Sequence, residues 1–371
     1  MSVRKLDNGK WEARARVDGR HLKKVFERKT DAVAWEAKTR HDRDHGSHVN
    51  TSNRTTVAEY FTTWYQGRSL RPNTVRIREI MLRAHLDQTP LGSRPLVKVK
   101  PSDVQAYARS RAEVLGPDAL RIHIGVLRSA FGAALLDGLI TRNPVPPVRG
   151  LWLPKPDRPK IIPLTVAQVR AWADAAKPQV RPMILTQAGL GLRISELLGL
   201  RVMDVDFPRR EVRINGQLNL QGERAPLKTA NSLRVVPMPD FLIPVLAGHI
   251  RRYPPGNAGY VFTSDESTRT DHAWGQRSAA RWYRIAASAA GLPDSTTSHD
   301  LRHHYASVLL DAGESVHAVA ERLGNTAQMV LGVYGHLMPD REETTRLAID
   351  RAWGAAEITA NPPAQAEQDQ L

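Results

Sequence analysis

The proline-rich stretch from residue 143 to residue 163 sets the strongest limit on how this chain can fold. It reads NPVPPVRGLWLPKPDRPKIIP and holds seven prolines in 21 residues. Proline lacks the backbone N–H that helices and central strands require, so this segment must be extended. We interpret it as a linker between domains. The length of 371 residues is enough for two or three domains.

The charge balance favours a polyanionic partner. Lys and Arg exceed Asp and Glu, which gives a formal net charge of +15. Nucleic acid is the simplest such partner, although ribosomal and membrane-surface proteins are also basic. The absence of cysteine excludes a disulfide, a thiolate zinc site and a cysteine nucleophile. The start, MSVRKLDNGKW, lacks the apolar core of a signal peptide, and no apolar run is long enough to span a bilayer. We therefore expect a cytoplasmic protein without a membrane partner.

Residues 1–30 predict a small basic sheet, with ten basic and four acidic side chains. The run KWEARARVDGRHLKKVFER alternates around Asp18-Gly19, a strong hairpin signal, and Asn8-Gly9 predicts an earlier turn. Three short strands should result, and the helical stretch TDAVAWEAKTRHDRDHG should cover one face of them. The other face is either an ordinary solvated surface or, as we favour, a DNA-binding ribbon. It keeps the basic side chains Arg14, Arg16 and Lys23.

The rest of the chain predicts a mainly helical protein. Residues 55–145 contain about four helical segments, of which the last three are opened by Pro, Asp or Asn, and indicate a compact bundle. From residue 164 the pattern is mixed: helices flank EVRINGQ, LNLQG and LRVVPMP, which predict a small antiparallel sheet. The predicted fold class is thus multidomain, mainly α with small β-sheets. The last residues, 356–371, are acidic and we expect them to be mobile.

Five short stretches carry residues suited to chemistry on a phosphodiester. Each also has a plain structural interpretation, such as a helical ion pair of Arg193 with Glu196, a solvated hairpin lysine, or a half-buried packing tyrosine. The stretches are GLRISEL with Arg193, LKTANSLRVVPM with Lys228, HDLRHHYAS with His299 and Arg302, LGN with Asn325, and YGH with Tyr334.

Taken together, these residue types match the needs of a pentavalent phosphate transition state. Arginine forks bind non-bridging oxygens, and histidine can donate to them or move a proton. A lysine can protonate a leaving alkoxide, and a tyrosine hydroxyl can act as the nucleophile. The set lacks the clustered carboxylates of a magnesium-dependent nuclease. We therefore expect no metal and no cofactor.

In this order and spacing, the motifs resemble those of the tyrosine recombinases, specifically the phage integrase branch. The resemblance is strong from about residue 164 to 354 and less specific over the helical region. The N-terminal residues resemble the three-stranded arm-site-binding domain of lambda-like and actinobacterial phage integrases. The resemblance implies an arm-type DNA-binding domain, a core-site-binding domain, a linker, a catalytic domain and a tail, at 1–48, 55–145, 146–163, 164–355 and 356–371.

The resemblance also implies a role for each site residue. Arg193 and Arg302 would stabilise the phosphate, and Lys228 would protonate the leaving 5′-hydroxyl. His299 would support proton transfer and orient the phosphate. Tyr334 would attack the phosphate to give a 3′-phosphotyrosine. The implied partners are double-stranded DNA with core-type and arm-type attachment sites, a homotetramer that exchanges strands through a four-way junction, and possible host DNA-bending and excision factors.

The position of Asn325 departs from the family pattern, which usually has His or Trp nine residues before the tyrosine. An amide can donate a hydrogen bond to a phosphate oxygen but does not titrate near neutral pH. We therefore expect a hydrogen-bonding role for Asn325 and question a proton-transfer role. His303 and His336 fit side positions of the pattern and are assigned no chemical step.

Gly332 and Gly335 flank the predicted nucleophile. The resemblance implies that only half of the protomers are active at one time, so we interpret these glycines as hinges for a tyrosine that moves in and out of the site.

Two other functions remain open. A type IB topoisomerase uses the same chemistry but need not carry an arm-like N-terminal domain. A non-catalytic DNA-binding regulator could carry a decayed recombinase domain, but intact catalytic positions argue against that.

Overall fold

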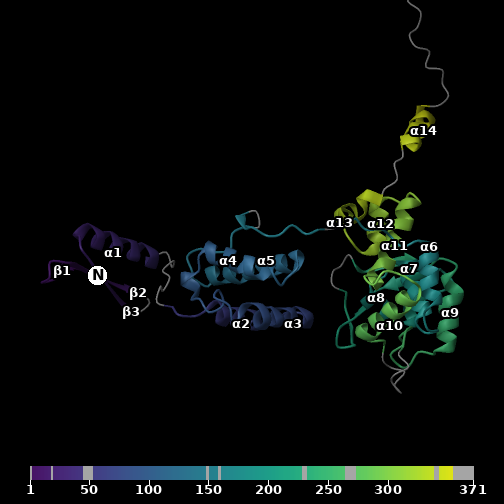
Figure 1. The fold of residues 1–371 in the computed structure, drawn as a ribbon, viewed down its shortest axis with the longest axis horizontal. Helices are drawn as coiled ribbons and strands as arrows, with labels where there is room; N and C mark the ends of the chain where they lie inside the picture. Colours follow the sequence, from purple (N-terminus) through teal and green to yellow (C-terminus); the bar gives the residue numbers. More distant parts are fainter. Residues whose placement is uncertain are drawn as a thin grey trace, which may run out of the picture. The chain divides into compact units, whose positions relative to one another are not determined.

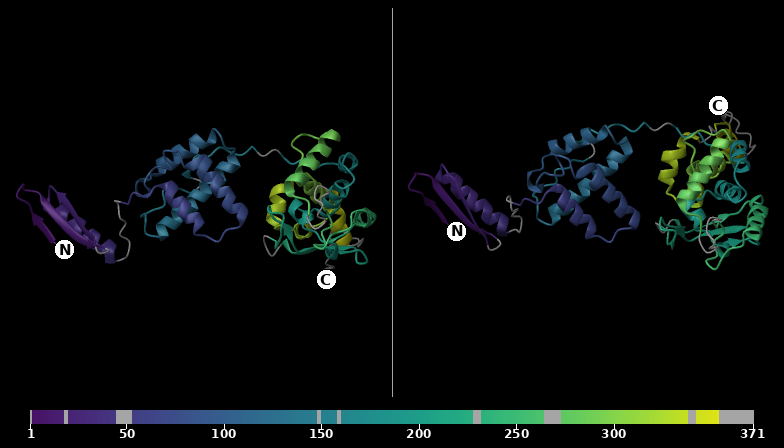
Figure 2. Two further views of the ribbon diagram at one scale, coloured as in Figure 1. Left: turned by 90° about the horizontal axis from the view of Figure 1, so that it is seen from below. Right: turned by 60° about the horizontal axis from the view of Figure 1, so that its bottom comes forward.

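The computed structural model divides the chain into two compact units, Met1–Arg158 and Pro159–Leu371. The boundary falls within the predicted linker. The division of the first unit into two smaller domains stays a prediction. The elements of both units are drawn in Figure 1 and Figure 2. The structure describes residues 2–17, 20–44, 53–147, 150–157, 160–227, 232–263, 273–337 and 342–353.

The first unit begins with the predicted three-stranded sheet. Strands β1 (Ser2–Lys5), β2 (Trp11–Val17) and β3 (Arg20–Phe26) are antiparallel in the order β1-β2-β3, and helix α1 (Lys29–Asp44) follows. Gly9 closes the first turn with a φ of 82°, a conformation that favours glycine. The predicted second turn, Asp18-Gly19, lies outside the described residues.

One face of this sheet is covered and the other is open. Residues Ala13 and Ala15 of β2 are buried, and α1 packs on the sheet with Ala32 fully buried. Because side chains alternate along a strand, Arg14 and Arg16 lie on the opposite face. The strand register pairs Arg14 with Lys23 there, which matches the predicted basic face.

Helices α2 (Val57–Gln66), α3 (Pro72–Ile80), α4 (Pro101–Ala112) and α5 (Pro117–Leu136) form the predicted bundle. A π-helical turn, Met81–Leu86, continues α3, and a 3-10 turn, Leu96–Lys98, precedes α4. Among the described helices, α5 alone is long and apolar enough to cross a membrane by length and composition. Its buried side chains, however, include Leu120, Ile124, Leu127 and Phe131, which pack into the core of this bundle.

The second unit holds two small sheets rather than the single predicted one. Strands β4 (Val205–Asp206), β5 (Glu211–Ile214) and β8 (Arg234–Pro237) form the first, in the order β4-β5-β8. The LNLQG stretch instead contributes to a separate hairpin of β6 (Gln217–Leu218) and β7 (Arg224–Ala225). The reason is a tight turn with Gly222 at a φ of 84°, which folds β7 directly back on β6.

Helices surround these sheets and supply most of the core. The larger core contains Trp172, Trp274 and Tyr283, and the indole N–H of Trp172 donates to the Tyr283 carbonyl at 2.9 Å. Helices α11, α12 and α13 pack beside one another around a smaller core (Figure 1). The helices of this unit are α6 (Val166–Asp174), α7 (Arg181–Leu190), α8 (Ile194–Leu198), α9 (Leu242–Arg252), α10 (Gln276–Ala289), α11 (Ser298–Asp311), α12 (Val316–Leu323), α13 (Ala327–Tyr334) and α14 (Glu342–Trp353), with 3-10 turns at Val202–Asp204 and Gly335–Leu337.

Candidate active site

A glycine break between α7 and α8 positions Arg193. Helix α7 ends at Gly191, whose φ of 62° is left-handed. A Cβ at this position would lie 2.3 Å from the Tyr305 ring, so both the backbone and the packing require glycine. Arg193 then caps the N-terminus of α8, and its own N–H donates to Glu196 at 3.0 Å.

The side chain of Arg193 joins two segments that are far apart in the sequence. Its Nη1 donates to Glu196 Oε1 at 2.7 Å, so the ion pair of the structural interpretation is present. Its Nη2 donates to Asn325 Oδ1 at 2.7 Å and to the Gly324 carbonyl at 3.3 Å. Gly324 ends α12 in the left-handed conformation and directs the chain toward this contact.

A buried ion pair beneath Arg193 was not predicted. Arg234 on β8 donates to Glu196 Oε2 at 2.8 Å, and both side chains are almost fully buried. Burial raises the pKa of Glu196, but the hydrogen bond and charge of Arg234, followed by Arg193, outweigh this and lower it overall. Arg234 Nε also donates to the Arg322 carbonyl on α12 at 2.7 Å. Glu196 therefore stays ionised and holds Arg193 in place.

Arg302 is the most buried of the predicted site residues that the structure describes, with an exposed fraction of 2%. Its Nη1 donates to the Gly191 carbonyl at 2.7 Å, and its Nη2 donates to the Leu323 carbonyl at 2.6 Å. One guanidinium thus ties the segment before Arg193 to the segment before Asn325. Burial, then the charge of Arg193, lowers the pKa of Arg302 to about 9, so it remains charged at neutral pH. Further N–H donors of the fork remain for a ligand.

Tyr334 contacts His303, to which the sequence motifs assign no chemical step. Its phenol oxygen lies 2.8 Å from Nδ1 of His303. The ring of His303 meets that of His299, one turn earlier on α11, with centroids 4.5 Å apart. Burial, then the charge of His299, lowers the pKa of His303 to about 4. Partial loss of hydration, then the charge of Arg302, lowers the pKa of His299, and burial raises that of Tyr334.

Tyr334 is also a packing residue, as its structural interpretation predicted. Its exposed fraction is 3%, and it belongs to the core between α11, α12 and α13. Neither Gly332 nor Gly335 adopts a left-handed φ, and a Cβ on either would meet nothing within 4 Å. Packing in this conformation therefore gives no reason for glycine at either position.

Comparison with known proteins finds relatives of this chain among integrases and recombinases. Residues 164–341 match the model of the phage integrase family. The chain is 26% identical over 353 residues to a prophage phiRv2 integrase of Mycobacterium tuberculosis, covering 92% of each chain. It is 29% identical over 301 residues to the tyrosine recombinase XerC of a Methylobacterium species, covering 76% of this chain and 88% of that one. Residues 164–341 belong to the phage integrase family of tyrosine recombinases.

Solved structures similar to this integrase share its fold. The Tn1549 transposon integrase in complex with transposon right end DNA has a TM-score of 0.69 at 24% identity, covering 81% of this chain and 100% of that chain. A lambda integrase tetramer bound to a Holliday junction has a TM-score of 0.59 at 15% identity, covering 92% of this chain and 95% of that chain. The predicted fold class is confirmed.

One predicted position of the integrase, His336, stands apart from the network. The Nε2 of His336 lies 3.0 Å from the carbonyl of Ile161, so its ring contacts the first residues of the second unit. Lys228 lies outside the described residues. The residues that the structure does bring together are Arg193, His299, Arg302, Asn325 and Tyr334, with His303, Glu196 and Arg234 added.

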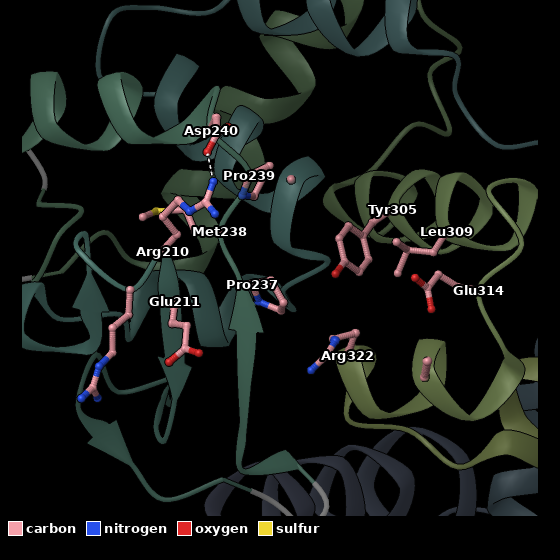
Figure 3. Close-up of a pocket in the computed structure, with 13 residues that line it drawn as sticks. Arg210, Glu211, Pro237, Met238, Pro239, Asp240, Tyr305, Leu309, Glu314 and Arg322 are labelled. Atoms are coloured by element: carbon pink, nitrogen blue, oxygen red, sulfur yellow. Dashed lines mark hydrogen bonds and ion pairs between the residues drawn. The ribbon is translucent and has the colours of Figure 1, made fainter.

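A cavity of about 700 Å³ lies close to this network but apart from the predicted chemistry. It opens between the end of β8 and helices α11 and α12, where Tyr305 and Arg322 face Arg210 and Asp240 across it (Figure 3). None of the described site residues lines it. Tyr305, whose ring packs on Gly191, separates the cavity from the loop that holds Arg302.

Proposed function

We propose that this tyrosine-type site-specific recombinase integrates and excises DNA through a covalent 3′-phosphotyrosine at Tyr334 and a Holliday junction. The observation that carries the proposal is the contact network that joins a phenol nucleophile, two arginines and two histidines at the ends of α8, α11, α12 and α13. Similar proteins are integrases described in complex with transposon DNA and with a Holliday junction, which supports DNA as the substrate.

His303 is suited to receive the phenol proton. In the Nε2–H tautomer its Nδ1 accepts the hydrogen bond from Tyr334, and its low pKa keeps the ring neutral at pH 7. The phenol oxygen then forms a bond to phosphorus while the bond from phosphorus to the 5′-oxygen breaks. The tyrosyl proton leaves toward Nδ1, and the 5′-oxygen takes a proton from Lys228.

The arginines and the asparagine are suited to the phosphate oxygens. Arg193 and Arg302 are both held by protein acceptors and retain further N–H donors. Asn325 Oδ1 accepts from Arg193, so Nδ2 remains as its donor. Asn325 thus supplies a hydrogen bond without a titrating group, in line with the expectation from the sequence.

The remaining assignments belong to the same proposal. The N-terminal sheet and helix would bind arm-type sites, the helical bundle core-type sites, and the protein would act as a tetramer on DNA in the host cytoplasm. A host DNA-bending factor and an excision factor would complete the reaction. Because one chain with two DNA-binding domains bridges two DNA segments, arm contacts would raise the effective concentration at the core site.

The test uses attachment-site DNA recovered from the two junctions of the integrated element. A duplex nicked near the cleavage point should trap wild-type protein as a covalent adduct, while Tyr334→Phe binds the same DNA and forms none. A protease-sensitive adduct with Tyr334→Phe would show that another residue is the nucleophile. A relaxation assay on supercoiled DNA without attachment sites separates the recombinase from a type IB topoisomerase, which would relax it efficiently.

A further inference from the structure

The open face of the N-terminal sheet contains a carboxylate. A surface that binds only phosphates would not benefit from this negative charge. Among the described strand residues of this face, Glu12 is the single acid, placed beside Arg4 by the register of β1 and β2. Its side chain is only 9% exposed, although α1 covers the other face. The side chains of Arg4 and Arg14 cover it instead.

Both arginines bind Glu12 in the same way. Arg14 Nε donates to Glu12 Oε1 at 2.6 Å, and Arg4 Nε donates to the same oxygen at 3.0 Å. A guanidinium anchored through Nε keeps its Nη1–Nη2 edge available. That edge matches the paired acceptors of guanine in the major groove or two phosphate oxygens. Both arginine side chains are about half exposed, so this edge is accessible.

The other basic residues of this face lack such an anchor. Arg16 and Lys23 are exposed, and no described acidic residue pairs with either of them. A flexible cation of this kind suits phosphates, which carry no sequence information. A guanidinium held at one angle suits base edges, because bidentate recognition depends on its orientation.

We propose that Glu12 is a positioning residue for sequence recognition, which fixes the guanidinium forks of Arg4 and Arg14 for base-edge contacts in duplex DNA. The inference rests on the proposed arm-type function of this sheet. Glu12 does not strengthen DNA binding in general, because its negative charge opposes it. Glu12 lowers the affinity for all DNA and increases the discrimination between sequences.

The experiment selects DNA from a randomised duplex library with four full-length proteins and one truncation. The arm-type motif is the one that wild type enriches and that a chain lacking residues 1–50 does not enrich. Glu12→Gln should lower the affinity ratio of that motif over a scrambled duplex by roughly tenfold, within the range of one bidentate base contact. Its affinity for the scrambled duplex should stay equal or rise, because a negative charge is lost.

Two matched variants complete the design. Glu27→Gln makes the same charge change at an exposed carboxylate that pairs with Lys10 at 2.6 Å, and it should leave the ratio unchanged. Arg14→Lys keeps the charge but removes the fork, so it should lower the ratio as Glu12→Gln does.

The outcomes separate this inference from the function on which it rests. Identical motifs from wild type and the truncation would overturn the arm-type function itself. An arm motif with a wild-type ratio in Glu12→Gln or Arg14→Lys would overturn the role of Glu12 alone. Loss of affinity for the scrambled duplex as well, in Glu12→Gln, would show that the carboxylate serves folding rather than recognition.

Discussion

The phenol oxygen of Tyr334 and Nδ1 of His303 lie 2.8 Å apart, although 31 residues separate them in the sequence. The contact places a neutral imidazole at the atom that must lose its proton. Burial raises the pKa of Tyr334, so the phenol keeps its proton near neutral pH until an acceptor takes it, and Nδ1 of His303 is the acceptor in contact with it. We therefore group His303 with the proposed catalytic residues.

Replacing His303 should slow cleavage and leave DNA binding intact. His303→Phe keeps an aromatic ring but removes the acceptor, and loss of a positioned base typically lowers a rate about 10²–10⁴-fold. His303→Gln keeps an acceptor that cannot take up a proton near neutral pH, so its cleavage rate should lie between those of wild type and His303→Phe. Single-turnover cleavage of a nicked duplex measures this. Wild-type rates from His303→Phe would mean that the proton leaves by another route.

The buried pair Glu196–Arg234 should matter more than an exposed pair of similar length. Removing one partner of a buried pair leaves an uncompensated charge and destabilises by roughly 3–5 kcal/mol. Arg234→Leu should therefore lower the urea midpoint of the second unit and, through Glu196, misplace Arg193. The control is Arg210→Leu, which removes an exposed pair with Asp240 at 2.8 Å and should change stability by about 0–1 kcal/mol. Equal effects of the two variants would contradict the role assigned to Arg234.

Local sequence signals predicted part of this site. The contacts between residues far apart in the sequence could not be predicted from such signals. Arg193 is predictable at the start of α8, because a glycine break precedes an apolar helical run. The cap at Gly324 is likewise a local feature. Arg234, by contrast, meets Glu196 across 38 residues, and an arginine alternating with valines on a strand does not reveal which acid it will reach. The separate hairpin of β6 and β7 was missed for a different reason, because strands of two residues are too short to show an alternating pattern.

Acid should destabilise the helical bundle through His123. This side chain is 8% exposed, its ring centroid lies 5.0 Å from that of His85, and its Nδ1 has no partner among the described residues. Burial, then the charges of His85 and Arg111, lowers its pKa to about 4.

The sign of the pH effect follows from this shift. Between about pH 6.5 and 4 the unfolded chain binds a proton at His123 and the folded chain does not. Stability that is present near neutral pH is thus lost on acidification, by an amount on the order of 3 kcal/mol. His123→Leu should flatten the urea midpoint across this range. His317→Leu, at an exposed site in the second unit, is the control, and an unchanged slope in His123→Leu would refute the assignment.

The glycine before the nucleophile offers a test of the hinge. Because Gly332 lies inside α13 and a Cβ there meets nothing within 4 Å, Gly332→Ala should stabilise the helix by about 1 kcal/mol. If Tyr334 moves during the reaction, the same change should slow complete recombination while first-strand cleavage by preassembled protein changes less. Gly191→Ala is the contrast, since its left-handed φ and the Tyr305 ring make it destabilising. Faster or unaltered recombination with Gly332→Ala would remove the case for a hinge at this residue.

Asn325 gives the sharpest test of the site, because its two amide atoms have different partners. Oδ1 accepts from Arg193 at 2.7 Å, and Nδ2 is the proposed donor to the phosphate. Asn325→Asp keeps the size and the acceptor for Arg193 but loses the donor and adds a negative charge beside the phosphate. It should therefore fold normally and lose more activity than Asn325→Leu, for which loss of one preorganised donor lowers the rate about 10²–10³-fold.

Asn325→His should retain activity, because a neutral imidazole can accept from Arg193 at one nitrogen and donate from the other. It should also gain a pH dependence between roughly pH 6 and 8, which wild type lacks at this position. Single-turnover cleavage of a nicked duplex across that range measures all three variants. Equal rates for Asn325→Asp and wild type would show that Nδ2 does not meet the phosphate, even though the side chain contacts Arg193.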